Sequence, residues 1–407
     1  MLYTFGSNDP AKKYLSKYIP FMAGISTFLP IGLLYLTLIL LLIFILATFA
    51  QRSHLISKLK PLWLAIGIYT FCGLLGWLFL FWQEMWFDAS ASRLFHIFRT
   101  ALILILGLLM LTNERYWAVK GFVTGALLCL LVYLINIFYP LPYSIMWHNM
   151  LSVTGNASSQ KMILLACTSS YFLYLALNSF KLKFKLLFLT LFSTATFVVI
   201  FIGASRNAQL LTFVLPILTI FFYKPNLKVF VFICFSTFCL FIIFYYTSDT
   251  LYQRFNMAIY EFNANINLHS CQGSVSARME MASVSIKQML LHPLTGTGVG
   301  SWLAIWPSFS EACPMSAGLN NPHNDYALAG METGVLGLFS LLWLYFQLFK
   351  SGFKNALGGN IIPLLFITTL AISSLFNGPL RDAVLGMAIT WMATATLHDK
   401  DHPPSEA

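Results

Sequence analysis

Residues 31–50 read IGLLYLTLILLLIFILATFA, twenty consecutive positions that carry no charged side chain. A helix of about 20 apolar residues is long enough to cross the hydrocarbon core of a bilayer. The apolar run already begins at residue 18, and Pro30 and Gly32 interrupt it. Residues 18–50 therefore form either a hairpin of two short membrane helices or one long kinked helix.

The composition extends this interpretation to the whole chain. Of its 407 residues, 58% are hydrophobic and only 9% are charged, whereas about 25% of the residues of a soluble domain are charged. Lipid can solvate such a chain, so we predict an all-α polytopic membrane protein, with residues 1–407 as a single membrane domain of about twelve transmembrane helices. The expected spans are residues 18–29, 31–50, 61–82, 93–111, 116–139, 159–178, 186–204, 207–223, 229–247, 323–349, 360–376 and 380–397.

Lysine-rich segments set the predicted topology, because Lys and Arg concentrate in cytoplasmic loops. Basic clusters flank residues 18–50 on both sides, which favours the hairpin. The alternation then places both chain termini in the cytoplasm of a bacterial-type inner membrane. The net charge of +10 is spread over these short loops, so we predict no nucleic-acid partner. The clusters are Lys12, Lys13 and Lys17; Arg52, Lys58 and Lys60; Lys181, Lys183 and Lys185; Lys224 and Lys228; and Lys350 and Lys354.

One large segment, residues 248–322, is expected on the outer side and is expected to contain short helices. Its middle has helical spacing: Ser274 or Ser276 can cap a helix there, and Pro293 ends it. The apolar positions of that helix are expected to face the membrane or the other helices; they are Met279, Ala282, Ile286 and Leu290. Cys271 and Cys313 are the only cysteines of the segment, and an oxidising compartment would allow a disulfide between them.

Arginines follow a different pattern from lysines, since six of the eight fall at outer positions of the predicted topology. A guanidinium group binds phosphate through forked hydrogen bonds and stays charged in any environment. Arg206, in FIGASRNAQLL, and Arg278, in GSVSARMEMAS, are therefore candidate anion-binding residues. Arg93, His96 and Arg99 form a further row at i, i+3 and i+6, for which we expect contacts to substrate phosphates.

Signatures of nucleotide and metal sites do not occur. The sequence has no GxxxxGK[ST] loop, no DxD pair in a loop and no Cys/His cluster with metal-ligand spacing. Gly296, Gly298 and Gly300 do not follow a predicted strand, so we interpret them as a flexible turn. We predict neither a cofactor nor a metal.

His323 is the sharpest candidate catalytic residue. It lies in LNNPHNDYALAGMETGVLGL, where the large segment returns to the membrane, and Asp325 follows two residues later. An unperturbed imidazole pKa of about 6.5 suits a group that takes up a proton near neutral pH.

At this point the residues resemble a known family. HNDYALAGMETGVLG fits the pattern H[NSQ]-x9-G-x-x-G of the bacterial O-antigen ligases, with His323, Asn324, Gly334 and Gly337 at its fixed positions. Residues 190–350 resemble the domain that O-antigen ligases share with O-antigen polymerases. The resemblance implies transfer of O-antigen polysaccharide from undecaprenyl pyrophosphate to lipid A–core oligosaccharide, on the periplasmic face and without ATP or metal.

The resemblance also implies roles for particular residues. Arg206, Arg278 and His323 carry over as functional residues. The two arginines would stabilise the leaving pyrophosphate, and His323 would deprotonate the acceptor hydroxyl, so that the anomeric configuration inverts. Residues expected to contact substrate are Asn324, Asp325, Arg381, Asp382, Arg93 and Arg99, and either Asp325 or Asp382 is expected to orient the imidazole.

Three other functions are compatible with parts of this pattern. An O-antigen polymerase uses the same donor but usually divides its outer mass between two large loops. A protein O-oligosaccharyltransferase of the same superfamily usually carries a further C-terminal region. A transporter or flippase of lipid-linked glycan would place ionisable residues near the bilayer midplane and show paired broken helices, and neither feature is evident in the sequence.

Overall fold

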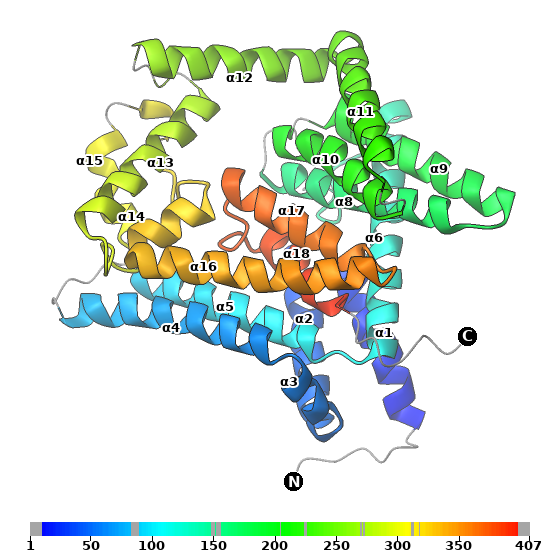
Figure 1. Cartoon of the computed structure of the whole chain (residues 1–407), viewed down its shortest axis with the longest axis horizontal. Coiled ribbons are helices and arrows are strands. Elements are labelled where there is room, and N and C mark those ends of the chain that lie inside the picture. Colours follow the sequence, from blue (N-terminus) through cyan, green and yellow to red (C-terminus); the bar gives the residue numbers. More distant parts are fainter. Residues whose placement is uncertain are drawn as a thin grey trace.

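The computed structural model describes residues 10–82, 89–147, 151, 156–203, 205–223, 226–268, 271, 273–310, 313–316 and 318–397. These residues form helices and no strand, as the sequence predicts (Figure 1). The elements are α1 (Pro10–Ser26), α2 (Ile31–Ala47), η1 (Phe49–Arg52), α3 (Ser53–Lys58), α4 (Lys60–Trp82), α5 (Ser90–Leu108), α6 (Thr112–Phe138), α8 (Asn156–Asn178), α9 (Leu182–Phe197), η2 (Val198–Ile202), α10 (Arg206–Tyr223), α11 (Leu227–Thr247), α12 (Asp249–Leu268), α13 (Ser274–Leu291), α14 (Trp302–Ile305), α15 (Pro307–Ser310), η3 (Pro314–Ser316), α16 (Asp325–Leu357), α17 (Ile362–Phe376) and α18 (Val384–Ala395).

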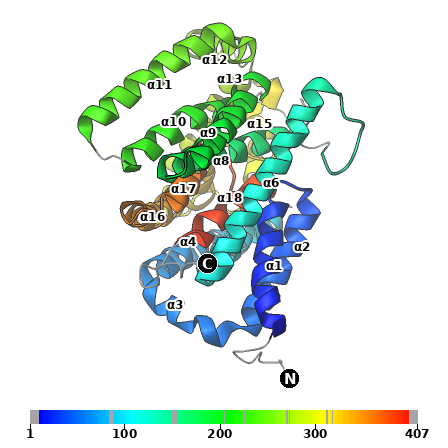
Figure 2. The ribbon, with the colours of Figure 1, turned by 90° about the vertical axis from the view of Figure 1, so that its right-hand side faces the viewer.

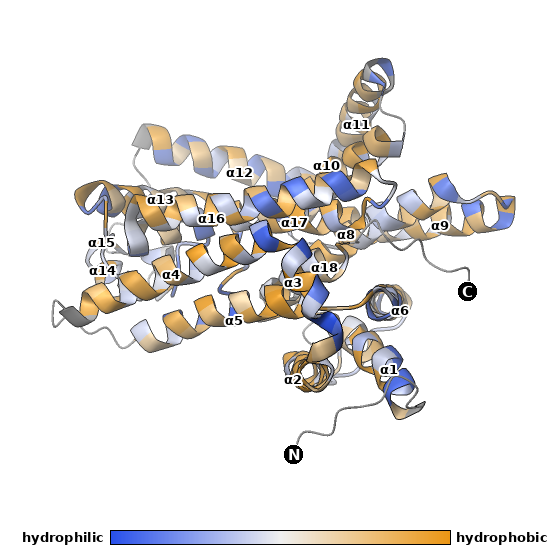
Figure 3. Cartoon of the chain, turned by 60° about the horizontal axis from the view of Figure 1, so that its bottom comes forward, coloured by the Kyte–Doolittle hydropathy of each residue, from blue (hydrophilic) through white to orange (hydrophobic). Residues whose placement is uncertain are grey.

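Eight helices of the described residues are long and apolar enough to cross a membrane, or nine if the bent pair Ile31–Ala47 and Phe49–Lys58 forms one span. α17 and α18 are apolar but shorter. A helix lies at each of the twelve predicted positions, but the number that span the membrane stays a prediction. Large apolar side chains are exposed on the outer helices: Phe232 and Phe235 of α11 are 67% and 65% exposed. Figure 3 shows such hydrophobic faces along several helices, a surface that lipid stabilises and water does not.

The N-terminal apolar run forms two helices, as the hairpin interpretation requires. α1 ends at Ser26 and α2 begins at Ile31, and Pro30 precedes the new helix. The buried ammonium group of Lys161 donates to the carbonyls of Thr27 (2.6 Å) and Leu29 (3.4 Å) in the break. These carbonyls have no partner within their own helix, so the lysine stabilises the break between α1 and α2.

The helices pack in two directions. α4 lies side by side with both α16 and α5, and α17 and α18 pack between α16 and α5 (Figure 1). α1, α2 and α6 stand across this direction in Figures 1 and 3, and α12 lies at the end of the molecule opposite α3 in Figures 1 and 2. Close packing of α1 on α6 depends on Gly121, where an added Cβ would lie 2.0 Å from the Phe21 carbonyl oxygen.

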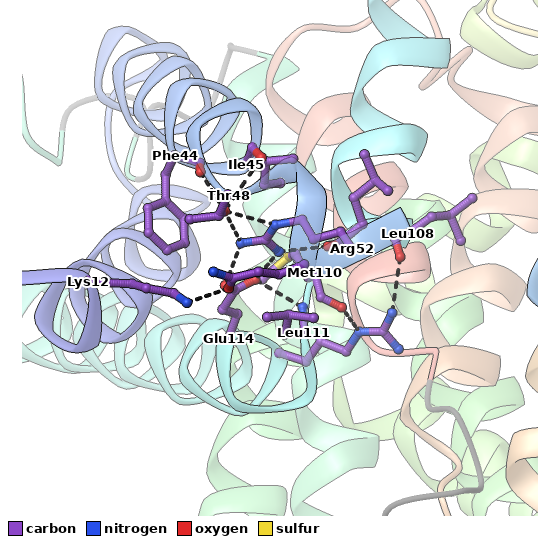
Figure 4. A network of polar contacts seen from close by, with 12 residues as sticks. Lys12, Phe44, Ile45, Thr48, Arg52, Leu108, Met110, Leu111 and Glu114 are labelled. Atoms are coloured by element: carbon purple, nitrogen blue, oxygen red, sulfur yellow. Dashed lines mark hydrogen bonds and ion pairs between the residues drawn. The ribbon is translucent and has the colours of Figure 1, made fainter. Parts of the chain in front are cut away.

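A buried polar network joins the bend after α2 to the turn between α5 and α6 (Figure 4). Arg52 is fully buried and donates to both carboxylate oxygens of Glu114 at 2.7 Å. The same guanidinium group donates to the Leu109 carbonyl (2.7 Å) and to the Thr48 hydroxyl. Glu114 also accepts the backbone N–H of Leu111. The network therefore fixes the 86° bend between α2 and the η1–α3 segment.

The predicted helix in the outer segment is α13, and it ends two residues before Pro293. Its N-cap is Gly273, whose N–H donates to the Ser276 hydroxyl (2.9 Å). The predicted apolar face does not pack inside the protein, because Ile286 and Leu290 are 47% and 68% exposed. The packed face lies on the other side of the helix, against α16, since Met281 and its neighbours are the buried residues; they are Ser276, Ala277, Met281, Val284 and Ser285.

A second, smaller core holds the outer segment together. Cys271 and Cys313 form a disulfide, with their Cα atoms 5.0 Å apart. The rings of Trp302 and Trp306 stack nearby at 5.0 Å, and both indoles donate to carbonyls of the segment that follows. This core packs on α13 and on the first turns of α16.

The glycine motif of α16 has a structural explanation. Gly334 adopts φ 69° and ψ −164°, which interrupts the helix. The loop of residues 293–300 lies against the interruption, where the N–H of Val335 donates to the Pro293 carbonyl (2.8 Å). In return, Thr297 and Gly298 donate to the carbonyls of Met331 and Glu332. The loop therefore forms hydrogen bonds with backbone N–H and C=O groups of α16 that an uninterrupted helix would pair internally.

Replacing Gly334 with alanine should destabilise the fold by about 1–3 kcal/mol or more, because only glycine adopts this backbone conformation without strain. The added Cβ would also lie 2.5 Å from the Pro293 carbonyl oxygen. Thermal unfolding in detergent micelles measures the effect. Gly67→Ala is the matched control, since a Cβ there meets nothing within 4 Å. Equal melting temperatures of the two variants would contradict the assignment.

Candidate active site

A polar cavity of about 550 Å³ lies where five segments of the chain meet. α5, α8 and α13 each contribute to its wall, as do the residues before α16 and the turn between α17 and α18. Its volume falls in the range of roughly 300–1,000 Å³ that is typical of small-molecule pockets. The lining residues are Ser92, His96, Ser159, Gln160, Arg278, Gly318, Leu319, Asn320, Asn321, His323, Asn377, Gly378, Arg381, Asp382 and Leu385.

His323 lies in this cavity in an unusual backbone conformation. Its φ is 53°, and it is the single non-glycine residue with positive φ among the residues that the structure describes. The Asn321 side chain accepts the His323 N–H (2.7 Å) and supports this conformation. Strained backbone of this kind is concentrated at functional sites.

The electrostatic surroundings keep the His323 ring neutral. Burial and the positive charges of Arg278 and Arg381 together lower its pKa to about 4, and a hydrogen bond with the Asn377 backbone opposes the shift. A neutral imidazole at neutral pH has a free lone pair and can accept a proton.

Two guanidinium groups line the cavity without a carboxylate partner. Arg278 and Arg381 form no ion pair with any described residue. Burial and the charge of Arg206 lower the pKa of Arg278, and Glu261 opposes this. Burial and the charge of Arg93 lower the pKa of Arg381 to about 10, so it remains charged at neutral pH. An anionic ligand would neutralise both groups.

Arg206 does not line this cavity. It opens α10 and donates to the Ser274 hydroxyl (3.1 Å) and to Glu261 (3.4 Å). Glu261 in turn accepts the N–H of Val275 (2.6 Å), so this group links α10, α12 and the start of α13. The structure thus places Arg278 and His323 in one cavity, with Arg206 close enough to Arg278 for their charges to interact.

Arg206 lines a second, apolar cavity of about 430 Å³ between α10, α11 and α12. Arg254 of α12 is the other cationic residue of its lining. Aromatic and aliphatic side chains make up most of the wall, among them Leu210, Phe213, Ile217, Phe238, Phe241 and Phe255. This combination suits a ligand with an anionic head and a long apolar tail.

Neither predicted carboxylate orients the imidazole. Asp325 is buried and accepts hydrogen bonds from the Ser374 hydroxyl (2.9 Å) and the Leu380 N–H (3.0 Å). Asp382 lines the cavity, but one of its oxygens caps α18 by accepting from Val384 and Leu385, and the other accepts from Gln160. Burial raises the pKa of Asp382, and the bonds from the backbone of α18 oppose the shift. Both carboxylates therefore hold the turn between α17 and α18 in place.

Arg93 and Arg99 are not among the residues that line the cavity, although the sequence predicts that they contact substrate phosphates. Arg93 is buried and forms an ion pair with Glu332 (2.7 Å). Arg99 donates to the carbonyls of residues 380, 381 and 382 at 3.0–3.3 Å. These contacts tie Arg93 to α16 and Arg99 to the turn between α17 and α18, so each supports the architecture of the site.

Asn324, like Arg93 and Arg99, has a structural role. It is the N-cap of α16, where its side chain accepts the Ala327 N–H (2.9 Å). An N-cap asparagine satisfies one of the free N–H groups of the first helical turn. It does not line the cavity, and its contribution is to begin the helix directly after His323.

Sequence reasoning missed several residues of the site. Gln160, Asn377 and Ser159 are ordinary polar residues near predicted helix ends, and no local pattern distinguishes them. Glu332 could have been recognised from the sequence, because a carboxylate within a membrane helix needs a partner. Its partners are Arg93 and the Gly300 N–H (3.1 Å). Among the described residues, no group of three or more His, Cys, Asp or Glu side chains gathers in the manner of metal ligands.

Comparison with known proteins gives a family match for the middle part of the chain. No curated protein matches it. Residues 189–342 match the family model described as O-antigen ligase, a range that contains Arg206, Arg278, His323 and the interrupted start of α16. The match supports membership of the O-antigen ligase superfamily, whose members are glycosyl-transfer enzymes of the ligase and polymerase kind.

Proposed function

We propose that this protein joins O-antigen polysaccharide, carried on undecaprenyl pyrophosphate, to lipid A–core oligosaccharide. One observation supports the proposal: the neutral imidazole of His323 shares a cavity with the guanidinium groups of Arg278 and Arg381, which form no ion pair with a described residue. A one-step displacement of a lipid pyrophosphate requires a base and an anion-binding group.

In the proposed reaction, His323 takes the proton of an acceptor sugar hydroxyl. The oxygen attacks the anomeric carbon of the donor, and the bond between that carbon and the pyrophosphate oxygen breaks. The leaving lipid pyrophosphate keeps the electron pair, and Arg278 and Arg381 stabilise its added negative charge. Preorganised charges at a partly buried site stabilise such developing charge strongly. A single displacement inverts the anomeric configuration.

The two cavities suit the two parts of the donor. The polyprenyl chain would lie in the apolar cavity between α10, α11 and α12, with Arg206 and Arg254 in its wall. Arg278 interacts electrostatically with both Arg206 and His323. The pyrophosphate would therefore lie near Arg278, between the apolar tail and the reacting sugar.

Donor binding would also tune the base. The positive charges of Arg278 and Arg381 lower the pKa of His323 in the free protein. A bound pyrophosphate would cancel much of this field, so the imidazole would become a stronger base when the donor is present. A general base works best when its pKa lies near the operating pH.

The proposed setting is the bacterial inner membrane, with the cavity open to the periplasm and both termini in the cytoplasm. Lysine-rich helix ends support this arrangement. In Figure 1, the α8–α9 turn and the end of α16 lie at one side of the molecule, and α13 to α15 lie at the other. Basic residues favour the cytoplasmic side, and the disulfide between Cys271 and Cys313 suits an oxidising periplasm.

Reconstitution tests this function. Purified protein in liposomes, given undecaprenyl-pyrophosphate-linked glycan and rough lipopolysaccharide without nucleotide or divalent metal, should yield lipopolysaccharide of high mass on a gel. The expected control is that omission of rough lipopolysaccharide abolishes the product. Lengthening of the glycan on the donor lipid in that control would show a polymerase instead. Consumption of neither substrate would contradict both functions.

A further inference from the structure

The wall of the polar cavity on the side of α5 and α8 has a chemistry of its own. Ser92 and His96 lie four residues apart on α5, so they share one face of the helix. Ser159 and Gln160 face the same space from the first turns of α8. None of the four carries a charge comparable to that of Arg278 and Arg381, so this side is not built for phosphate.

Two polar side-chain atoms on this side lack hydrogen-bond partners among the described residues. Gln160 is 8% exposed, and its amide N–H donates to Asp382. Because an ionised carboxylate only accepts hydrogen bonds, this bond fixes the orientation of the amide, and Gln160 Oε1 is left as a buried acceptor without a partner. His96 Nδ1 is also buried without a partner, and neither nitrogen of that ring bonds to any described residue.

Buried acceptors without partners cost free energy and are rare in native structures. Gln160 and His96 both line the cavity, and the broad ring torsion of His96 allows a small rotation that presents Nδ1 to it. A phosphate has no proton to donate to them at neutral pH, whereas a sugar hydroxyl both donates and accepts. The cavity thus divides into a cationic side at Arg278 and Arg381 and an uncharged polar side at His96 and Gln160.

We propose that His96 and Gln160, together with Ser92, form a carbohydrate subsite that binds hydroxyl groups of the acceptor oligosaccharide beside the reacting sugar. This inference rests on the proposed transfer function, because it names the substrate that this side of the cavity selects. The subsite would hold the acceptor so that its reacting hydroxyl reaches His323. His96 and Gln160 are here substrate-binding residues and take no part in proton transfer.

His96→Phe is the cleanest test, because the substitution removes both ring nitrogens and breaks no bond to a described residue. A phenyl ring also keeps the contact of this side chain with the Phe95 ring, whose centroid lies 6.0 Å away. The probes are delipidated core oligosaccharide from rough lipopolysaccharide and undecaprenyl pyrophosphate, each titrated calorimetrically against full-length protein in detergent. Binding of the core oligosaccharide should weaken about fivefold, the effect of one hydrogen bond, and binding of undecaprenyl pyrophosphate should not change.

Two further variants complete the test. Gln160→Met should weaken core-oligosaccharide binding in the same way. His54→Phe changes an exposed histidine of α3 outside the cavity and should bind both probes like the wild type. Unchanged oligosaccharide binding by His96→Phe, or weaker binding of undecaprenyl pyrophosphate instead, would overturn the subsite. A wild type that binds the oligosaccharide through His96 but forms no product would support the subsite and count against the proposed transfer.

Discussion

His323→Asn is expected to lower the rate of glycosyl transfer by about 10²–10⁴-fold, the contribution of a positioned general base. Asparagine is chosen because it tolerates positive φ better than other residues, so the backbone at φ 53° is kept. The loss should appear in the turnover rate measured with saturating donor and acceptor in liposomes. His54→Asn, in exposed α3, is the matched control and should retain full activity.

The rate of transfer should also depend on pH in a defined direction. The neutral imidazole is the active form, so the rate should fall as the pH falls through the pKa of His323, which is about 4 in the free protein. Arg278 lowers that pKa, so Arg278→Gln should raise it and move the acid limb of kcat/KM to higher pH. Retention of full activity by His323→Asn, or an acid limb that stays in place in Arg278→Gln, would contradict the assignment of His323 as the base.

Glu114→Ala is expected to destabilise the protein by about 3–5 kcal/mol, because it leaves a buried guanidinium group without its counter-charge. Arg52 is 0% exposed and donates to both oxygens of this carboxylate. Loss of the carboxylate also removes the acceptor for the Leu111 N–H at the start of α6. The effect is measured by unfolding the purified protein in detergent with denaturant or with heat.

A paired replacement serves as the control. In the double variant Arg52→Met with Glu114→Leu, no buried charge remains, and apolar side chains of similar volume often replace a buried ion pair without loss of stability. Most of the stability should therefore return. If the double variant were as unstable as Glu114→Ala, the cost would lie in lost packing and not in the uncompensated charge of Arg52.

Hydropathy predicted the position of the membrane helices well, because the length of an apolar run is a local property. It left open how a helix is turned. On α13 the spacing of Met279, Ala282, Ile286 and Leu290 predicted an apolar face toward the membrane or the other helices, and the structure packs α16 on a different face, which is centred on Met281. Both faces carry apolar residues at helical spacing, and only the neighbouring helices determine which one is buried.

For the site, the sequence identified His323 and Arg278, which lie together, and Arg381 and Asp382, which line the same cavity. It assigned substrate contacts to Arg93 and Arg99, which instead hold Glu332 and the turn at residues 380–382. An arginine that binds phosphate and one that binds backbone carbonyls carry the same side chain. The difference lies in the partner, and a sequence alone does not show partners that are about 240 to 280 residues away.

The sequence by itself determined that this chain is all-helical and that its apolar runs suit a membrane. Through the H-x10-G-x-x-G spacing it also predicted His323 as the candidate base, whereas the interruption of α16 at Gly334 came from the structure. Only the tertiary structure decided which charged groups are free to bind a ligand, that Gln160 and His96 face the same cavity as His323, and that Arg206 belongs to a neighbouring apolar cavity. The physical reason is that apolar length and glycine conformation are encoded locally, whereas the availability of a polar group depends on which distant atoms satisfy its hydrogen bonds.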